Sequence, residues 1–330
     1  MTTKSPNDTY TSPLAARNAS PEMCRIWSPR HKFQTWRKIW LAVAEAQHEV
    51  TKDWDKPLVT MEQIEELRAN LEVTDEDLQL AAKYEAELRH DVMAHVHAWG
   101  DRCPKARPII HLGMTSQDVV CNADLMNLRQ SVLLIQTKAA RVAIDLANEA
   151  NQNKAVATLG FTHYQAAQPT TVGRRMAGWS YEIEMTIDRI AELHDLANLR
   201  FRGFRGATGT QASFLELFGS GAVVDAFDGI AREKLANEGD LCAYSLTGQT
   251  YPRVVDTFVL ADLASIASVL HKIATDIRLL SNRKEIDEPF GKNQIGSSAM
   301  PYKRNPMKCE RICGLTRFVM NLVGNAYDTA

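Results

Sequence analysis

The serine-rich segment at residues 294–306, QIGSSAMPYKRNP, has the residue types most suited to chemistry. Gly296 and the pair Ser297 and Ser298 carry little side-chain mass, so we expect a mobile loop. A serine hydroxyl is a weak base at neutral pH, but a nearby cation such as Lys303 favours its alkoxide form. The composition also fits a plain Gly/Ser hinge between two helices, with its basic residues on the solvated side.

A helix is predicted directly after this loop. Asn305 and Pro306 have the types of an N-cap and a first helical residue. We expect the helix to run from Met307 to about Val323. Because the N–H groups at a helix start attract anions, this helix start and Lys303 together predict a site for a negatively charged group.

Three histidines lie close together in RHDVMAHVH, residues 89–97. His90, His95 and His97 do not share one face of a helix, because they are not three or four residues apart. A zinc-binding pair on a helix needs a spacing of four, so we do not expect a metal site here. The charged triplet that opens the segment is typical of a solvated helix face.

Two loop segments between predicted helices are rich in small residues. Thr115 and Ser116 follow Gly113, where the simplest interpretation is an ST-turn or a helix N-cap, and a helix start also suits an anion. Glycine recurs at every third residue from Gly203 through RGATGTQ at 205–211. The segment is not a GxGxxG after a strand, so we expect a flexible loop and no dinucleotide site.

A single histidine, His163, precedes the second long helix. A lone histidine is commonly structural, but here Thr162, Gln165 and Gln168 provide polar company that can orient the ring. Histidine is also the side chain that most readily exchanges a proton near neutral pH. His163 is therefore a candidate general acid.

Helical periodicity dominates the chain. We predict an extended arm over residues 1–22 and then three helices, at 33–47, at 60–71 opened by a Thr60–Gln63 capping box, and from about 75 to 100. Three long heptad-like runs follow, at residues 125–146, 176–193 and 255–280. Long helices with narrow apolar seams predict a bundle, so the fold class is all-α. We expect a small N-terminal helical domain over 1–115 and a long-helix bundle domain over 116–330.

Bulk composition fits a globular protein. The 330 residues are 45% hydrophobic and 24% charged, with a net charge of −2, so nothing indicates a nucleic-acid or membrane surface. We find no apolar run near the roughly 18 residues that a membrane span needs. The six cysteines form no CxxC pair, which favours reduced thiols and a cytoplasmic location.

The segment GSSAMPYKRNP resembles the signature of the fumarase/aspartase superfamily, lyases that release fumarate. RHDVMAHVH and the GQTY that contains Gln249 are similar to the animal-type adenylosuccinate lyase family within it. The resemblance implies Ser297 as the catalytic base, with Ser298 as the alternative, and His163 as the general acid of a THxQPAQ motif. The proline of that motif is Ala166 here, and Pro169, which we expect to start the helix, follows instead.

The same resemblance implies a set of substrate-binding residues and a quaternary structure. The substrates are adenylosuccinate and SAICAR, the oligomer is a homotetramer whose active sites take residues from three subunits, and neither cofactor nor metal is needed. Asn18 stands where the family has a tyrosine. The implied substrate-binding residues are Arg17, Asn18, Arg89, His90, Asp91, Thr115, Ser116, Gln249, Lys303, Asn305 and Arg311.

Family chains continue through another bundle helix and a C-terminal helical domain. We therefore expect this chain to be C-terminally truncated relative to the family, as a fragment, an isoform or a shortened gene product. Two alternatives stay open. One is another fumarate-releasing lyase, such as an argininosuccinate or carboxymuconate enzyme. The other is a catalytically impaired chain that acts only as a helical assembly partner.

Overall fold

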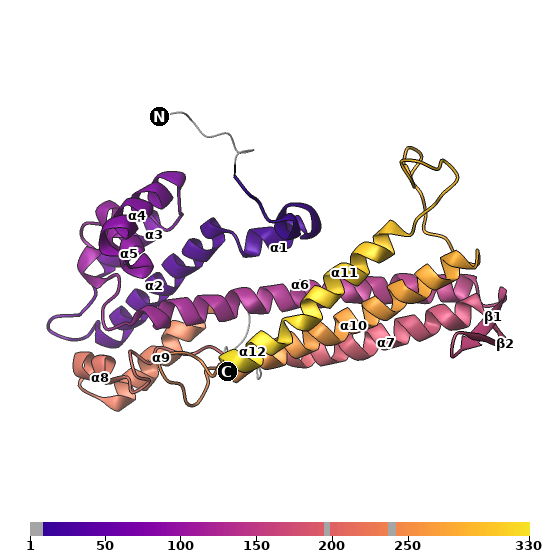
Figure 1. The fold of residues 1–330 in the computed structure, drawn as a ribbon. Helices are drawn as coiled ribbons and strands as arrows, with labels where there is room; N and C mark the ends of the chain where they lie inside the picture. The colour runs from indigo at the N-terminus through magenta and orange to yellow at the C-terminus, as the bar shows by residue number, and fades with distance from the viewer. Residues whose placement is uncertain (1–8, 195–198, 237–241) are drawn as a thin grey trace. The chain divides into compact units, whose positions relative to one another are not determined.

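The computed structural model describes residues 9–194, 199–236 and 242–330, and this part of the chain is almost entirely helical (Figure 1). It divides into two compact units, which are considered separately. Unit 1 comprises Met1–Ser131 and Leu196–Pro252, and unit 2 comprises Val132–Asp195 and Arg253–Ala330. The predicted all-α fold class is confirmed, with one two-stranded hairpin added among the described residues.

The compact units differ from the domain division predicted at residues 115 and 116. Helix α6 (Ser116–Gln152) contributes its first part to unit 1 and the remainder to unit 2. The segment Leu196–Pro252 belongs with the N-terminal helices. Heptad spacing identifies a long helix but does not reveal which unit each part of it packs against.

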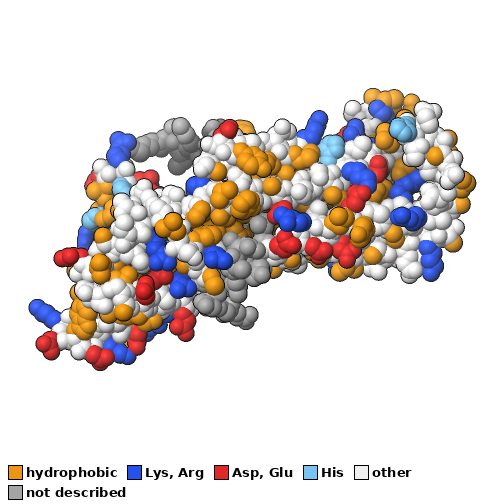
Figure 2. Space-filling model, turned by 90° about the horizontal axis from the view of Figure 1, so that it is seen from below, with side chains coloured by type: hydrophobic (Ala, Val, Ile, Leu, Met, Phe, Trp, Pro, Cys, Tyr) orange, Lys and Arg blue, Asp and Glu red, His pale blue; other side chains and the backbone are white. Residues whose placement is uncertain are grey.

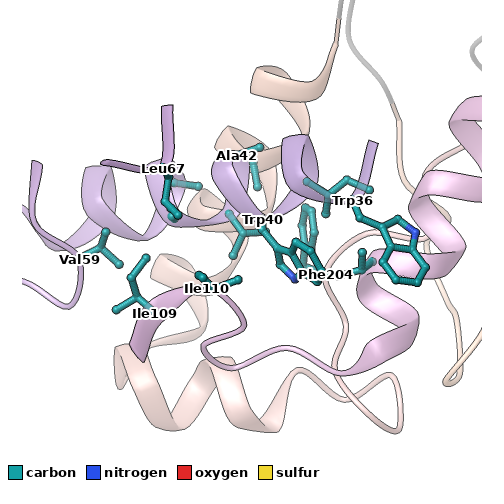
Figure 3. Packing of buried hydrophobic residues seen from close by; sticks show 14 of the residues in the cluster. Trp36, Trp40, Ala42, Val59, Leu67, Ile109, Ile110 and Phe204 are labelled. Carbon is teal, nitrogen blue, oxygen red and sulfur yellow. The ribbon is translucent and has the colours of Figure 1, made fainter. Parts of the chain in front are cut away.

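Unit 1 consists of helices around one apolar core, and most of these helices are short. Its elements are the π-helical turn η2 (Leu14–Asn18), α1 (Pro21–Ile26), α2 (Pro29–Thr51), α3 (Met61–Ala69), α4 (Asp75–Leu88), α5 (Asp91–Arg102), the 3-10 turn η3 (Arg107–Ile109), the first part of α6, α8 (Ala212–Phe218) and α9 (Gly221–Leu235). Trp36, Trp40 and Phe204 are buried at its centre among aliphatic side chains (Figure 3). Val119 and Ala123 of α6 belong to the same core, which fixes the start of α6 within unit 1.

Side-chain caps set several helix boundaries in unit 1. The predicted capping box of Thr60 and Gln63 is present at the start of α3, and a second box opens α4. The single helix predicted from about residue 75 to residue 100 is wrong. Arg89 adopts a left-handed backbone conformation, with φ of 55°, and separates α4 from α5. The arm predicted as extended over residues 1–22 also contains η2 and α1.

Unit 2 is a bundle of long helices. Its elements are the remainder of α6, β1 (Ala157–Thr162), β2 (Gln165–Thr171), α7 (Val172–His194), α10 (Val254–Asn282), α11 (Met307–Asn321) and α12 (Val323–Thr329). Helix α10 packs against both α7 and α11 (Figure 1). Ser180 of α7 donates a hydrogen bond to the carbonyl of Ala143 in α6 at 2.8 Å. The predicted heptad runs thus fall within α6, α7 and α10.

The segment at residues 157–171 is a β-hairpin, which the sequence did not predict. Its two antiparallel strands close at Thr162 opposite Gln165. Pro169 lies in β2 opposite Leu159, so the expectation that this proline starts the following helix is wrong. Each strand of an isolated two-stranded ribbon has a free edge, and proline is tolerated there.

Helix α10 is more apolar than we expected from the sequence. By length and composition alone it is apolar enough to cross a membrane, with an 18-residue window of mean hydropathy 1.6, of which 33% is buried. The sequence-based expectation that no apolar run approaches this length was therefore wrong. In unit 2 this helix packs against α7 and α11, and an apolar core helix of a bundle has the same composition.

Candidate active site

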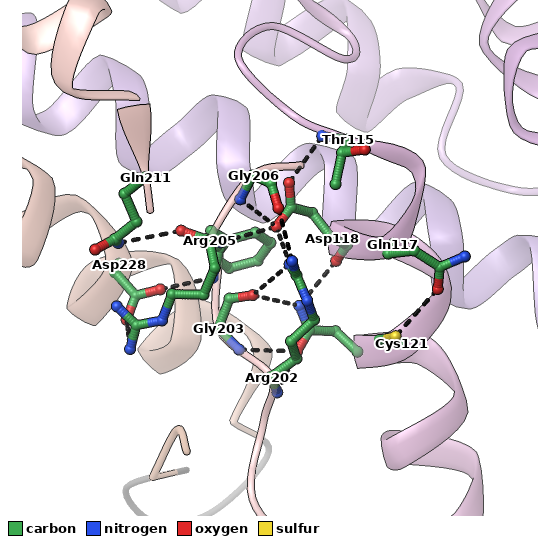
Figure 4. Close-up of polar contacts among 12 residues, drawn as sticks. Thr115, Gln117, Asp118, Cys121, Arg202, Gly203, Arg205, Gly206, Gln211 and Asp228 are labelled. Atoms are coloured by element: carbon green, nitrogen blue, oxygen red, sulfur yellow. Dashed lines mark hydrogen bonds and ion pairs between the residues drawn. The ribbon is translucent and has the colours of Figure 1, made fainter. Parts of the chain in front are cut away.

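A buried carboxylate, Asp118, organises the motif segments of unit 1 (Figure 4). It lies in the first turn of α6 and is fully buried. One of its oxygens accepts the backbone N–H of Thr115 at 2.8 Å. The other accepts the backbone N–H groups of Arg205 at 2.8 Å and Gly206 at 3.1 Å, and pairs with Arg202. One carboxylate therefore joins the Thr-Ser turn to the glycine-rich loop.

The environment of Asp118 combines opposing electrostatic effects. Burial raises the pKa of its carboxyl group, whereas the Arg202 guanidinium and the backbone N–H groups that donate to it act in the opposite direction. Asn122, one turn further along α6, adds a second anchor. Its side-chain oxygen accepts the backbone N–H of Arg202 at 2.9 Å. The start of α6 is thus the platform on which the glycine-rich loop rests.

The guanidinium of Arg202 extends this network to the Gln249 turn. It is fully buried and donates to the carbonyl of Gly206 at 2.7 Å and to the carbonyl of Gly248 at 2.9 Å. Gly209 has a φ of +81°, and a Cβ added there would lie 2.0 Å from the carbonyl oxygen of Thr247. Only glycine permits this close approach. Gln249 is exposed beside these anchors.

His90 connects the triplet at residues 89–91 to the turn that contains Thr115 and Ser116. It is the N-cap of α5, and its Nδ1 accepts the backbone N–H of Met93 at 3.4 Å. Since Nδ1 is the acceptor, the proton of the neutral ring lies on Nε2. Nε2 is 3.3 Å from the hydroxyl of Ser116, so the imidazole N–H donates to this oxygen. His90 is exposed, as predicted for this triplet, but it caps a helix that begins after it and does not lie on a helix face.

The other predicted residues of unit 1 lie at the surface. Arg89 is exposed at the end of α4, and the carboxylate of Asp91 accepts the backbone N–H of Val92 at 2.8 Å. Arg17 and Asn18 are exposed on η2, where the Asn18 side chain donates to the carbonyl of Pro13 at 3.0 Å. Within the described part of unit 1, no hydrogen bond or ion pair joins η2 to the Thr-Ser turn.

The two roles of His90 are separable by mutation. We expect His90→Ala to lower the free energy of unfolding by about 1 kcal/mol, because it removes the cap of α5. His90→Asn should retain most of that stability, because an asparagine oxygen caps a helix equally well. Chemical denaturation followed by tryptophan fluorescence measures both variants. Equal stability of the two variants would contradict the capping role.

In unit 2, His163 lies at the tip of the β1–β2 hairpin. His163 and Tyr164 are the two central residues of the turn, with φ of 51° and 60°. Positive φ at both positions usually requires asparagine or glycine, so this turn is strained. The imidazole is exposed and has no hydrogen bond, ion pair or ring contact with any described residue. It is therefore displayed on a fixed turn and is available to a partner.

Helices α7 and α10 hold this hairpin in place. The guanidinium of Arg283 lies 4.4 Å from the ring centroid of Phe161 and 5.2 Å from that of Tyr164, and these two residues precede and follow His163 in the sequence. Arg175 donates to the carbonyl of Leu159 at 2.9 Å. A cavity of about 320 Å³ lies between the hairpin and these helices. Such cation–π contacts offset part of the turn strain.

The loop between α10 and α11, residues 283–306, is called the serine loop here, and its two serines differ in their hydrogen bonds and exposure. The hydroxyl oxygen of Ser297 accepts the backbone N–H groups of Ala299 at 3.3 Å and Met300 at 3.2 Å. Ser297 is half-buried, whereas Ser298 is exposed. Two N–H groups that donate to one oxygen also stabilise negative charge on it. This geometry favours Ser297 as the base and gives Ser298 no comparable support.

The start of α11 differs from the prediction. Its N-cap is Pro306, which provides no side-chain cap, and Asn305 instead donates to the carbonyl of Gly296 at 3.0 Å. Two N–H groups of the first turn, those of Lys308 at 3.2 Å and Cys309 at 2.7 Å, donate to the carboxylate of Glu288. The predicted free anion site at this helix start is therefore wrong, because an internal carboxylate occupies it.

The remaining cations are available to a ligand. Lys303 and Arg311 are exposed, and their side chains have no partner among the described residues. Within the same residues, no group of three histidine, cysteine or acidic side chains is placed to bind a metal.

The sequence is similar to those of known proteins along most of its length. The sequence profile of a lyase family matches residues 15–321. The chain is 47% identical over 324 residues to adenylosuccinate lyase of Saccharomyces cerevisiae, covering 98% of this chain and 65% of that protein. It is 34% identical to adenylosuccinate lyase of Archaeoglobus fulgidus, covering 96% of this chain and 67% of that protein. The chain belongs to the adenylosuccinate lyase family.

A solved structure outside this family has a similar fold. The 3-carboxy-cis,cis-muconate lactonizing enzyme of Pseudomonas putida superposes with a TM-score of 0.80 at 25% identity, covering 94% of this chain and 66% of that one. The chain spans about 65% of the length of the yeast adenylosuccinate lyase. The chain thus has a fold similar to that of this lactonizing enzyme.

Several residues that organise this member of the adenylosuccinate lyase family were missed in the sequence. Asp118 follows Thr115 at capping-box spacing, so the pattern could have revealed it. Arg202, Arg283 and Glu288 contact partners 20 or more residues away, such as Asp118, Phe161 and Lys308. No local pattern predicts such contacts.

Proposed function

We propose that this chain catalyses release of fumarate from adenylosuccinate, giving AMP, and from SAICAR, giving AICAR, in purine nucleotide biosynthesis. The reaction is a β-elimination in which a carbon–nitrogen bond breaks and a carbon–carbon double bond forms. A base removes a proton from the carbon next to a carboxylate, and an acid protonates the departing nitrogen. The observation that carries the proposal is the pair of backbone N–H groups at the Ser297 hydroxyl, which favours its alkoxide.

Ser297 is the proposed base and His163 the proposed acid. Proton removal converts the neighbouring carboxylate into a dianionic aci-carboxylate, and Lys303 is the cation best placed on the serine loop to stabilise it. The strained turn displays the imidazole of His163 outward, as required of an acid that serves a site completed by another copy. Each step uses only protein groups.

The substrates carry a phosphate and two carboxylates, and cations and N–H donors are the groups that recognise them. In unit 1 the proposed binding groups are His90, Thr115, Ser116 and Gln249, which the network of Asp118 and Arg202 brings together, and also Arg17, Asn18, Arg89 and Asp91. In unit 2 they are Lys303, Arg311 and Asn305. Asn305 acts through the loop, because its amide holds Gly296.

We propose a cytoplasmic homotetramer with active sites shared between subunits. Unit 2 exposes apolar side chains along its helices, and hydrophobic side chains also gather among charged ones on the face in Figure 2. Contiguous exposed apolar surface marks sites of protein–protein interaction. The exposed residues are Leu133, Val142, Ile144, Tyr181, Met185, Phe258, Ile312, Phe318 and Tyr327.

The proposal is tested by incubating the 330-residue chain with adenylosuccinate and following fumarate by chromatography. Argininosuccinate and 3-carboxy-cis,cis-muconate serve as competing substrates, because a muconate enzyme shares the fold. We expect fumarate from adenylosuccinate alone. Fumarate from argininosuccinate, turnover of the muconate, or a folded tetramer without turnover would reject the proposal. The last outcome would favour the assembly-partner alternative.

A further inference from the structure

Glu288 lies in the first part of the serine loop, close to the end of α10. It follows the end of α10 by six residues, and its side chain is 8% exposed. One carboxylate oxygen accepts the N–H of Lys308 at 3.2 Å, and the other accepts the N–H of Cys309 at 2.7 Å. The carboxylate thus joins the two ends of the loop, and the Lys308 ammonium adds a hydrogen bond to the carbonyl of Pro289 at 3.3 Å.

This contact replaces an ordinary helix cap. The first N–H groups of a helix need acceptors, and Pro306 at the N-cap position offers none through its side chain. Glu288 supplies two acceptors and a negative charge, which the positive end of the helix dipole stabilises. It does so from 20 and 21 residues away in sequence, so it acts on the path of the loop as well as on α11.

A second contact closes the loop further out. The side-chain amide of Asn305 donates to the carbonyl of Gly296 at 3.0 Å. A Cβ at Gly296 would lie 2.2 Å from the carbonyl oxygen of Lys303, so the two strands of the loop touch there. Between these contacts and the tip lie Ser297 and Lys303. The contact at Glu288, near the bundle, and the contact at Asn305, further out, therefore hold together the two sides of the loop that carries Ser297 and Lys303.

We propose that Glu288 is a positioning residue, which joins the two ends of the serine loop and so sets where Ser297 and Lys303 are presented. The consequence for catalysis rests on the proposed function. The effect on the loop itself does not, because it follows from the contacts alone. Substrate anions are bound by the exposed cations of the loop, since Glu288 already occupies the start of α11.

Cys309 is a built-in reporter of this contact. Burial raises the pKa of its thiol to about 12, and the neighbouring Glu288 adds to the rise. A cysteine in the first turn of a helix without such a carboxylate nearby is more acidic and reacts faster with thiol reagents. The alkylation rate of Cys309 therefore reports the charge and position of Glu288 in the absence of substrate.

The test compares three variants of the full chain by hydrogen exchange and mass spectrometry. Glu288→Gln keeps the shape but has one acceptor for two N–H groups, and Glu288→Asp keeps the charge on a shorter side chain. Asp287→Asn is the matched control, because the Asp287 carboxylate accepts from Ser281 at 3.0 Å within the α10 side of the loop. Alkylation of Cys309 is measured on the same samples.

In Glu288→Gln we expect exchange of the Lys308 and Cys309 amides to rise by about tenfold, with faster exchange across 291–304 and faster alkylation of Cys309. Glu288→Asp should show a smaller rise, and Asp287→Asn none. Faster exchange at 308 and 309 with an unchanged loop would overturn the proposal, because Glu288 would then be only a cap. Unchanged exchange at both would overturn it as well.

The kcat and KM of the same variants test separately whether Glu288 affects catalysis. We expect Glu288→Gln to lower kcat by about tenfold or more with little change in KM, because a misplaced base slows the chemical step. A normal kcat beside a loosened loop would remove Glu288 from catalysis. If the unmodified chain shows no turnover, the proposed function fails, and the exchange results still decide the role of Glu288 in the loop.

Discussion

We expect Ser297→Ala to lower kcat for fumarate release by about a thousandfold and to leave the fold intact. Loss of a positioned general base costs between about a hundredfold and ten-thousandfold in rate. The hydroxyl accepts two N–H groups of its own turn, so the variant loses local hydrogen bonds but no core packing. Absorbance-monitored turnover of adenylosuccinate measures the effect, and circular dichroism verifies the fold.

Ser298→Ala is the matched control for this variant. Ser298 is the neighbouring residue of the same type, and it is exposed on the same loop. We expect its turnover to stay within a few-fold of that of the unmodified chain. The opposite pattern, an active Ser297→Ala and an inactive Ser298→Ala, would transfer the role of base to Ser298.

Asp118→Ala should give the largest loss of stability in unit 1. It leaves the fully buried Arg202 guanidinium unpaired and removes the acceptor of three backbone N–H groups, those of Thr115, Arg205 and Gly206. Breaking a buried pair from one side costs about 3 to 5 kcal/mol. Urea denaturation followed by the fluorescence of the buried tryptophans of unit 1 measures the loss.

A double variant controls for the charge that is left behind. Asp118→Leu combined with Arg202→Met removes both members of the pair and should be more stable than Asp118→Ala, because no buried charge remains unpaired. A cost below about 1 kcal/mol for Asp118→Ala would show that the network does not hold the glycine-rich loop to α6.

Much of the helical architecture could be predicted from local patterns. The heptad runs mark α6, α7 and α10, and the Thr60–Gln63 capping box marks the start of α3. These features depend on residues three to seven positions apart, which the sequence displays directly. The motif around Ser297 was likewise recognisable because its spacing is contiguous.

The wrong predictions have two physical causes, unusual residue types in local roles and contacts that are distant in sequence. The break at Arg89 depends on a left-handed residue followed by a histidine cap, and neither residue type is usual in its role. The His163 turn lacks the asparagine or glycine that normally identifies a tight hairpin. The start of α11 looked free because its cap, Glu288, lies outside the local sequence. The break at Arg89 is thus made by residue types that rarely signal it, and the cap of α11 is made by a contact that is distant in sequence.

Mixing two inactive variants tests whether Ser297 of one copy and His163 of another act in one site. Ser297→Ala and His163→Asn are each expected to be inactive, and asparagine tolerates the positive φ of the turn. After the two proteins are unfolded and refolded together, sites that combine an intact Ser297 with an intact His163 should restore fumarate release well above either variant alone. Mixed oligomers, verified by native mass spectrometry, that remain as inactive as the separate variants would contradict the claim.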